Sequence, residues 1–403
     1  MKKKIFLRKL KTLFFVLILD RVIRILLFPI SFAIFMLIVF LSPFKVIRLG
    51  KFRSDKIGHL SLEYEIILNE KLKKKNKSNT IDLWFKSKKI CNLFYYNLRK
   101  KDFFILPNFI FNEVFILLKK TIIFNKHCFH GQSDSDTNYV LDKTKSSITL
   151  SQSFIIKHLR ILYDLGLRKK QKIVCLHLRD TAYRGYSKYT DYKNIHRPEN
   201  YLKTIRYLIK KGYFVIRTGK RTKKILKIKN KYFLDYSRSN IRSDQMDIFL
   251  AHQCFFCISS GSGFDGVVRS FRKPVLFTNF LPIGYLHSFS KNNMTIFKHL
   301  IYKKKRKISL KENLDLDLAF ESNGEIFKEK NLKFVENTEQ EVYNAVKDMI
   351  NYLDGRSINF AFIKKKIEKI FKLEFIKKYG FTPHKKINGI IAPSFINSNK
   401  NLF

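Results

Sequence analysis

The chain has few cysteines and few acidic residues for its length. Its 403 residues include 5 Cys, and 32 Asp and Glu stand against 80 Lys and Arg. A small, odd number of cysteines, mostly on apolar segments, argues against a disulfide scaffold and favours a reducing compartment. The pair Cys254 and Cys257 is predicted to be two buried thiols on a strand rather than a redox or metal motif, because strand positions three apart point to opposite faces.

The scarcity of acidic residues leaves a formal net charge of +48. Such a charge invites a nucleic-acid function. However, the lysines are spread along the whole chain, and no zinc finger or aromatic RNA-binding signature accompanies them. We therefore expect the positive field to favour anionic membrane surfaces and phosphorylated substrates, and we disfavour nucleic acid as a partner. The 45% hydrophobic content, with 40 Phe, argues against wholesale disorder.

A motif for a metal-dependent site is also missing, because no predicted strand ends in paired carboxylates. Two D-x-D sequences occur. Asp134-Ser135-Asp136 lies in a polar stretch without an apolar strand before it. Asp315-Leu316-Asp317 alternates with leucines and is predicted to be the solvated face of an amphipathic strand. We predict no metal ligands.

One long apolar run is present near the N-terminus. Residues 25–44 carry no charge, and a run of about twenty residues is long enough to span a hydrocarbon core. Lys and Arg flank both ends, so the positive-inside rule gives no orientation, and the symmetry favours an in-plane or re-entrant anchor. Residues 5–24 have the composition of an interfacial helix. A buried core helix and a cleavable signal peptide are the alternatives, although no small-residue cleavage site follows the run.

The pattern predicts a mixed α/β chain, in which residues 46–160 form a smaller α/β or α+β half. We expect a membrane-associated segment over 1–45, an N-terminal α/β domain over 46–160, a Rossmann-like domain over 161–345, and C-terminal helices with a tail over 346–403. The polar stretch 131–138 is predicted to be a loop or a boundary.

Strand-then-helix units follow one another between residues 172 and 285, which favours a parallel sheet. Ligands of such sheets bind outside the carboxyl ends of the strands. The predicted strands are 173–177, 213–217, 254–258 and 274–277, and the predicted helices are 155–165, 198–209, 244–251, 264–271 and those within 341–379.

The first of these strands ends in a group of polar residues. His177 and Arg179 lie two apart and so share a face of the strand. The guanidinium of Arg179 suits phosphate oxygens, and Arg217, which closes the next strand, is predicted to add a second cation at the same edge. Asp180 follows as a general base or as the cap of the next turn. The alternative is a surface pair of Arg179 and Asp180 beside a core histidine.

A Ser/Gly corner follows the third strand. The segment from Gly261 to Gly266 matches G-x-G-x-x-G, whose backbone N–H groups approach phosphates. A dinucleotide site would need an acidic residue about twenty positions further on, yet no Asp or Glu lies between Gly266 and Lys311. We therefore disfavour a nicotinamide site and expect either a phosphate or sugar cradle or merely a tight turn. The residues of the predicted cradle are Ser259, Ser260, Gly261, Ser262 and Gly263.

Several segments, in this order, resemble a bacterial family of glycosyltransferases with a basic, apolar N-terminus, including H-x-R-D and S-D-x-x-D-I-F-L motifs. They are Arg53–His59, Val174–Asp180, Gly212–Gly219, Asp235–Ser237, Arg242–Leu250, Phe255–Phe256 and Ala392–Phe395.

The His-x-Arg corner with a later Ser/Gly loop is also similar to the O-fucosyltransferase-like fold, a metal-independent arrangement of two Rossmann domains of the GT-B type. The resemblance implies that Arg179 clamps the diphosphate of a sugar donor, and that His177, Ser260 and Ser262 contact phosphate or base. Those enzymes often carry two arginines in a row, whereas Asp180 follows Arg179 here.

Together these features predict a membrane-associated glycosyltransferase on the cytoplasmic face of the inner membrane. It would transfer a hexosyl or deoxyhexosyl group from a nucleotide-diphosphate donor to a lipid-linked or polysaccharide acceptor, as in lipopolysaccharide or capsule synthesis, without a further cofactor. We expect Asp180, and after it His59, as the base that deprotonates the acceptor. The alternative is a non-catalytic membrane-surface protein that binds anionic polymers through its lysines.

Overall fold

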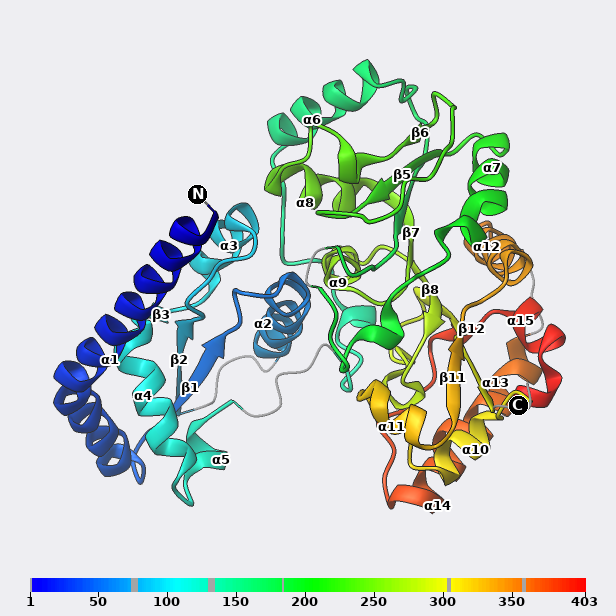
Figure 1. The fold of residues 1–403 in the computed structure, drawn as a ribbon. Coiled ribbons are helices and arrows are strands. Elements are labelled where there is room, and N and C mark those ends of the chain that lie inside the picture. Colours follow the sequence, from blue (N-terminus) through cyan, green and yellow to red (C-terminus); the bar gives the residue numbers. More distant parts are fainter. Residues whose placement is uncertain (1, 74–78, 130–134, 183–184, 303–305, 357–359) are drawn as a thin grey trace. The chain divides into compact units, whose positions relative to one another are not determined.

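The computed structural model divides the chain into two compact units, which we describe separately (Figure 1). Unit 1 comprises Met1–Lys56 and Lys71–Gln132, and unit 2 comprises Ile57–Glu70 and Ser133–Phe403. The structure describes residues 2–73, 79–129, 135–182, 185–302, 306–356 and 360–403, with side chains from residue 18 onward except 73 and 360–363.

Unit 1 is built on a parallel sheet, as expected for an α/β domain. Its strands lie in the order β1-β2-β3, and a parallel bridge between Leu49 and Cys128 extends the sheet beyond β1. The elements are β1 (Val46–Phe52), β2 (Thr80–Lys86), β3 (Ile105–Leu106), α3 (Leu93–Arg99), α4 (Asn108–Lys119) and α5 (Phe124–His127), with α2 (Tyr64–Lys73) leading into the unit from unit 2.

The N-terminal segment is one continuous helix, α1 (Lys2–Leu41), which runs through Pro29 and joins the two stretches that the sequence distinguishes. It packs on α4, where Arg24 forms an ion pair with Glu113 and the Ser31 hydroxyl donates to the carbonyl of Ile110 at 3.2 Å. Its Ile38 lies in a core with Leu49, Phe85, Val114, Leu118 and Cys128.

From Ile18 onward, where its side chains are described, much of α1 is apolar and exposed. Its segment Ile18–Leu41, 24 residues, is long and apolar enough to cross a membrane. Only 11% of an apolar stretch of 18 residues within this segment is buried. Buried core helices and signal sequences have the same length and composition. Because one face of α1 packs on α4 while residues such as Ile25, Leu26 and Phe40 face outward, the helix is neither a fully buried core helix nor free of the unit.

Unit 2 contains a seven-stranded parallel sheet (Figure 1). The strands lie in the order β12 (Ile390–Ile391), β9 (Asn293–Phe297), β8 (Val275–Phe280), β7 (Cys254–Ser259), β4 (Ile173–His177), β5 (Phe214–Thr218) and β6 (Phe233–Leu234). Six of them, numbered from β4, follow the 3-2-1-4-5-6 order of a dinucleotide-binding fold, so the order reverses between β4 and β7. The four predicted strands are confirmed to within a few residues.

Helices connect these strands, and polar caps set where several of them begin. Side chains of Ser151, Ser243 and Thr338 accept N–H groups of the first helical turn in α6 (Gln152–Asp164), α8 (Asp244–Gln253) and α12 (Glu339–Leu353). The helices are α6 (Gln152–Asp164), α7 (Leu202–Lys210), α8 (Asp244–Gln253), α9 (Gly263–Ser270), α10 (Leu310–Asp315), α11 (Gly324–Glu329), α12 (Glu339–Leu353), α13 (Phe360–Glu368), α14 (Phe375–Tyr379) and α15 (Pro393–Ser398), with a β10–β11 hairpin (His299–Tyr302, Leu332–Val335).

Two local predictions have a clear outcome. Cys254 and Cys257 are fully buried on β7, as expected. The amphipathic strand predicted at Asp315-Leu316-Asp317 is wrong. A capping box of Ser309 and Glu312 starts α10 at Leu310, and this helix runs to Asp315.

The two compact units divide at other residues than the predicted domain boundaries. Residues 57–70 belong to unit 2, and so does the segment from 133 to 160, where α6 packs on α8. The four predicted domains stay a prediction about independent folding.

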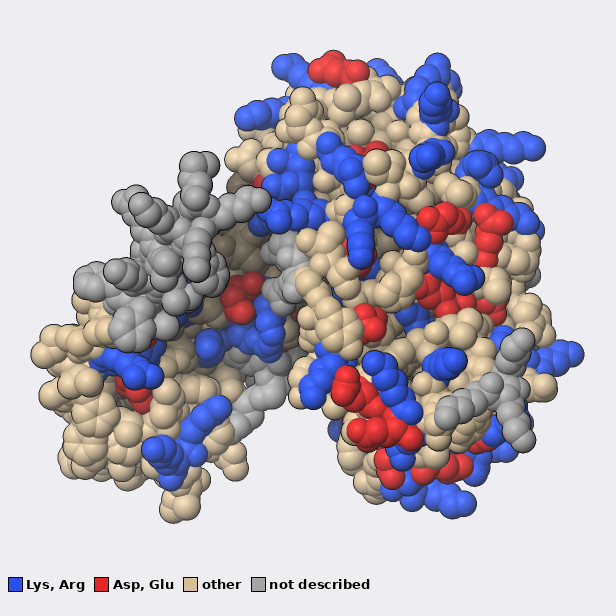
Figure 2. Space-filling model, viewed as in Figure 1, with Lys and Arg blue, Asp and Glu red and all other residues tan. Residues whose placement is uncertain are grey.

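Lys and Arg side chains are scattered over the visible surface of both units, with Asp and Glu interspersed (Figure 2). On this face they do not gather into one continuous stripe of the kind that follows a nucleic-acid backbone.

The packing of α1 is tested by two adjacent residues of similar size. Ile38 is 2% exposed and Leu37 is 53% exposed. We expect Ile38→Ala to lower the free energy of unfolding by about 2–4 kcal/mol, because it leaves a cavity in the core of unit 1, and Leu37→Ala to change it by less than about 0.5 kcal/mol. Denaturant unfolding in mild detergent measures both, and equal losses would contradict the helix orientation.

Candidate functional site

The carboxyl ends of β4, β5 and β7 bring polar side chains together at the point where the strand order reverses. In the sheet register His177 pairs with Thr218 on β5 and with Ser259 on β7, so the three residues share one face. The backbone N–H of Ser260 donates to the carbonyl of His177 at 3.2 Å. Crevices at such a reversal are where open parallel sheets bind ligands.

His177 is held from both ring nitrogens. Nδ1 lies 3.0 Å from the Thr218 hydroxyl, Nε2 lies 3.0 Å from the Ser262 hydroxyl, and the ring stacks on Phe264 at 5.1 Å. Burial, helped by the positive charges of Arg179 and Arg217, lowers the pKa of His177 to about 4. The imidazole is therefore neutral at physiological pH and orients neighbouring hydroxyls rather than supplying positive charge.

Arg179 and Asp180 lie just past the end of β4 and are tied to neighbouring loops. The backbone N–H of Arg179 donates to the Ser260 hydroxyl at 2.9 Å. Asp180 accepts the N–H of Ala182 at 2.9 Å and that of Lys223 at 2.7 Å. The carboxylate of Asp180 thus caps the turn, which was one of its two predicted roles, and fastens the loop after β4 to the loop after β5.

Arg217 is not on the same face of the sheet as His177. It pairs in register with Leu176, one residue earlier, and is 1% exposed. Its guanidinium donates to the carbonyl of Lys224 at 2.6 Å and to Asp235 at 3.3 Å. The predicted pair of cations at one rim is therefore not formed by these side chains, because the alternation of strand residues directs Arg217 into a buried ion pair.

The Ser/Gly corner is organised by the carboxylate of Asp265. This carboxylate accepts the backbone N–H of Ser262 at 2.6 Å and the hydroxyl of Ser259 at 2.8 Å, while Ser262 caps α9 in return. Gly261 adopts φ +81°, which a tight turn requires. Gly263 opens α9, and the first N–H groups of an α-helix have no acceptor within the helix.

The other glycines of the motif serve close packing. A Cβ added at Gly263 would lie 2.9 Å from the nitrogen of Gly58, and one at Gly266 would lie 3.0 Å from the Cα of Gly58. The start of α9 thus lies backbone to backbone against the segment that carries Gly58. This packing accounts for the G-x-G-x-x-G spacing without a dinucleotide.

His59 follows Gly58 directly and is thereby brought to the N-terminus of α9. It opens a π-helical turn, His59–Glu63, a conformation that is frequent at functional sites. Its Nδ1 lies 2.5 Å from an oxygen of Glu63, which is fully buried, while the His59 side chain is 27% exposed. A partly exposed imidazole that is oriented by a buried carboxylate has the arrangement of a base held by a third group.

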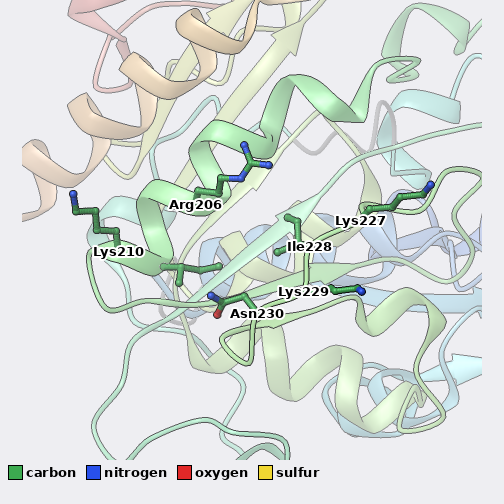
Figure 3. Close-up of a pocket in the computed structure, with 7 residues that line it drawn as sticks. Arg206, Lys210, Lys227, Ile228, Lys229 and Asn230 are labelled. Atoms are coloured by element: carbon green, nitrogen blue, oxygen red, sulfur yellow. The ribbon is translucent and has the colours of Figure 1, made fainter.

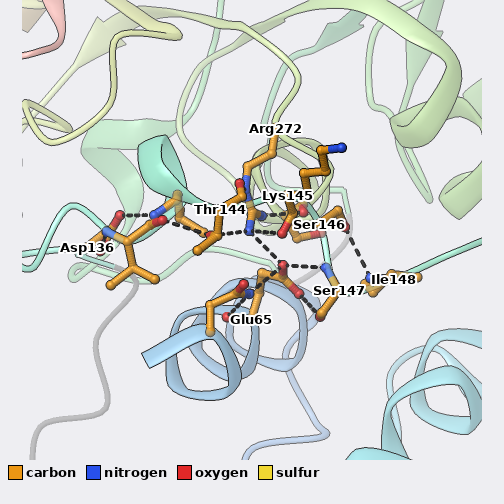
Figure 4. Close-up of polar contacts among 12 residues, drawn as sticks. Glu65, Asp136, Thr144, Lys145, Ser146, Ser147, Ile148 and Arg272 are labelled. Carbon is orange, nitrogen blue, oxygen red and sulfur yellow. Dashed lines mark hydrogen bonds and ion pairs between the residues drawn. The ribbon is translucent and has the colours of Figure 1, made fainter. Parts of the chain in front are cut away.

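The segment that carries His59 is fastened by a buried ion pair (Figure 4). Glu65 is fully buried and accepts from Arg272 at 2.9 Å and from the backbone N–H of Ser147 at 2.9 Å. Arg272 also donates to the carbonyls of Thr144 and Lys145 at 2.9 and 2.8 Å. Three chain segments distant in sequence are thus joined next to the candidate site.

The sequence did not assign a role at the site to four residues that contact it: Glu63, Thr218, Phe264 and Asp265. Asp265 had a usable signal, because Ser262-x-x-Asp265 matches a capping box. Glu63 lies four residues after His59, which is the spacing of neighbours on a helix. Thr218 and Phe264 had no such signal.

Within the described parts of the chain, no group of three His, Cys, Asp or Glu side chains is placed to hold a metal ion. Asp134 lies outside the described residues. Asp136 is buried and accepts the N–H groups of Val140 and Leu141 at 2.8 and 2.7 Å, so it caps a turn.

No family model and no curated protein sequence matches this chain. Among solved structures it is similar to a family 9 glycosyl transferase from Veillonella parvula, with 10% identity and TM-score 0.44 over 76% of this chain and 97% of that one. It is also similar to the ADP-heptose lipopolysaccharide heptosyltransferase II of E. coli, with 11% identity and TM-score 0.38 over 76% and 98% of the two chains. The glycosyltransferase TibC of enterotoxigenic E. coli gives 13% identity and TM-score 0.32 over 59% and 60%. The order of the strands in unit 2, and not these likenesses, identifies the fold.

The pKa of His177 predicts a pH dependence of stability. The pKa of His177 is about 4 in the folded chain, whereas a histidine without these contacts, as in the unfolded chain, has a pKa of 6.5. Between these two values the unfolded state therefore binds more protons than the folded state. The stability linked to His177 is therefore fully present above about pH 6.5 and is lost as the pH falls toward 4.

We expect His177→Gln to flatten the slope of the free energy of unfolding against pH between 4 and 6.5. His384→Gln is a matched variant, because burial also lowers the pKa of His384 to about 4, and the double variant should be flatter still. Denaturant unfolding over this pH range measures the slope. A slope that His177→Gln leaves unchanged would contradict the buried neutral imidazole.

Proposed function

We propose that the protein is a glycosyltransferase that uses a nucleotide-diphosphate sugar. The proposal is supported by three neighbouring features around the strand-order reversal. They are Arg179 beside the Ser/Gly corner, the N-terminus of α9 and the His59–Glu63 pair. The reaction needs a group that stabilises a departing diphosphate and a base that deprotonates a hydroxyl, and this arrangement holds candidates for both.

The donor diphosphate is proposed to bind between Arg179 and the Ser/Gly corner. A guanidinium and the free amides at a helix N-terminus both suit phosphate oxygens. Asp265 already occupies part of the α9 N-terminus, through the Ser262 N–H, so the phosphate would use the Gly263 end and the hydroxyls of Ser260 and Ser262. Neutral His177 fixes Ser262. Arg179 and these donors would neutralise the diphosphate without a metal ion.

His59 is proposed as the base that acts on the acceptor hydroxyl. With Nδ1–H donating to Glu63, Nε2 is free of that bond and can accept the hydroxyl proton, while Glu63 stabilises the imidazolium that forms. The acceptor oxygen then bonds to the anomeric carbon as the bond from that carbon to the diphosphate breaks. Asp180 is less suited, because both of its oxygens accept backbone N–H groups.

The acceptor is proposed to be lipid-linked or a cell-surface polysaccharide, as in lipopolysaccharide or capsule synthesis, and the sugar a hexosyl or deoxyhexosyl group. The acceptor would bind through the predicted domain over 46–160, in the two-domain GT-B manner. The exposed apolar face of α1 supports attachment in the plane of a membrane, because its other face is used by α4. We propose the cytoplasmic face of the inner membrane, in line with the five free cysteines.

Arg179 tests donor binding. We expect Arg179→Ala to weaken binding of UDP- or GDP-sugars by about 10- to 100-fold, because hydrogen bonds to charged groups contribute about 1.5–3 kcal/mol, and Arg179→Lys to restore part of it. Arg197→Ala, an exposed arginine of the same unit, is the control. Calorimetry on the detergent-solubilised chain measures the affinities. Unchanged binding in Arg179→Ala, with affinity for anionic polymers governed by salt, would favour the non-catalytic alternative.

His59 and Glu63 test the chemical step. We expect His59→Gln to lower kcat by about 10²- to 10⁴-fold with donor affinity unchanged, as for loss of a general base. Glu63→Gln should lower kcat less and move the pH profile. Asp180→Asn is the discriminating variant: a loss of kcat there with His59→Gln still active would reverse the assignment of the base.

A further inference from the structure

A cavity with a cationic rim lies in unit 2, away from the candidate site (Figure 3). Its volume is about 470 Å³. It is formed between α7 and the segment that leads into β6, and its lining residues are Arg206, Ile209, Lys210, Lys227, Ile228, Lys229 and Asn230.

The cavity lies at the amino ends of the strands, whereas the candidate site lies at their carboxyl ends. Residues 209–210 end α7 just before β5 begins, and residues 227–230 precede β6, so both belong to the amino ends of these strands. The candidate donor site lies at the carboxyl ends. A ligand of the cavity therefore does not depend on the proposed function.

The four cations of the rim have no acidic partner among the described residues. In the part of the chain that the structure describes, none of Arg206, Lys210, Lys227 and Lys229 takes part in an ion pair or hydrogen bond of its side chain. Cations on the same two elements that point elsewhere do find partners: Lys224 pairs with Glu199 at 3.5 Å and Lys203 donates to Gln340 at 2.6 Å. Gathering four like charges at one cavity costs free energy, which a bound anion would offset.

The interior of the cavity is partly apolar. Figure 3 shows Ile228 on the segment that faces the helix carrying Arg206, next in sequence to Lys227 and Lys229. Ile209 and Ile228 are half-buried, and Asn230 adds an amide that can donate or accept. Cations around an apolar floor suit a phosphate that carries an organic group.

We propose that this cavity binds a phosphate-bearing ligand, with the phosphate held by Lys227, Lys229 and Arg206 and an apolar stem against the two isoleucines. The same chemistry is offered by the headgroup of an anionic phospholipid and by free phosphates. The experiment has one arm for each source.

The test uses calorimetry on the full chain in mild detergent, with inorganic pyrophosphate in one arm and monomeric dihexanoyl phosphatidate in the other. Monomeric short-chain lipid avoids any contribution of α1 to binding of a membrane. The variant is Lys227→Gln with Lys229→Gln, and the matched control is Lys328→Gln with Lys330→Gln, two exposed lysines of unit 2 at the same spacing.

We expect the Lys227/Lys229 variant to weaken binding about tenfold or more, as for lost charge-assisted contacts, and the control to leave it unchanged. Binding of pyrophosphate assigns the cavity to free phosphates, and binding of phosphatidate without pyrophosphate assigns it to a lipid headgroup. Absence of binding in both arms, or equal weakening in variant and control, would overturn the proposal. Affinity for nucleotide sugars, read in the same samples, should not change, which separates this proposal from the donor site.

Discussion

The candidate site depends on one close contact, in which the backbone of Gly58 lies against the glycines that open α9. Without side chains at Gly58, Gly263 and Gly266, the two backbones approach to a distance that any Cβ would prevent. The contact carries the following residue, His59, to the N-terminus of α9. It also explains why residues 57–70 belong to unit 2 although the chain before and after them belongs to unit 1.

Three buried carboxylates hold the neighbouring parts of the site in place. Asp265 orders the Ser/Gly corner, Glu63 orients His59, and Glu65 joins its helix to Arg272. Each is removed from water and accepts several hydrogen bonds or a cation, which is the condition under which a buried charge is tolerated. In a chain with so few acidic residues, a cluster of them around one corner of the sheet is a concentrated use of negative charge.

The neutral state of His177 follows from the same environment. The surrounding hydroxyls of Thr218 and Ser262 can hydrogen-bond an uncharged imidazole from both sides, whereas burial and nearby guanidinium groups disfavour a charged one. The positive charge of the site is thus left to Arg179. Arg217 serves the interior instead, in its pair with Asp235.

Local pattern was sufficient for much of the fold. The sequence alone determined the strands and helices from 173 to 277, the buried thiols of β7 and a His-x-Arg corner at a strand end, because alternation and helical spacing are properties of neighbouring residues. Only the tertiary structure decided the strand order, the burial of Arg217 and the meeting of Gly58 with α9. These depend on which strand lies beside which and on contacts between residues some two hundred positions apart, and no local periodicity carries that information.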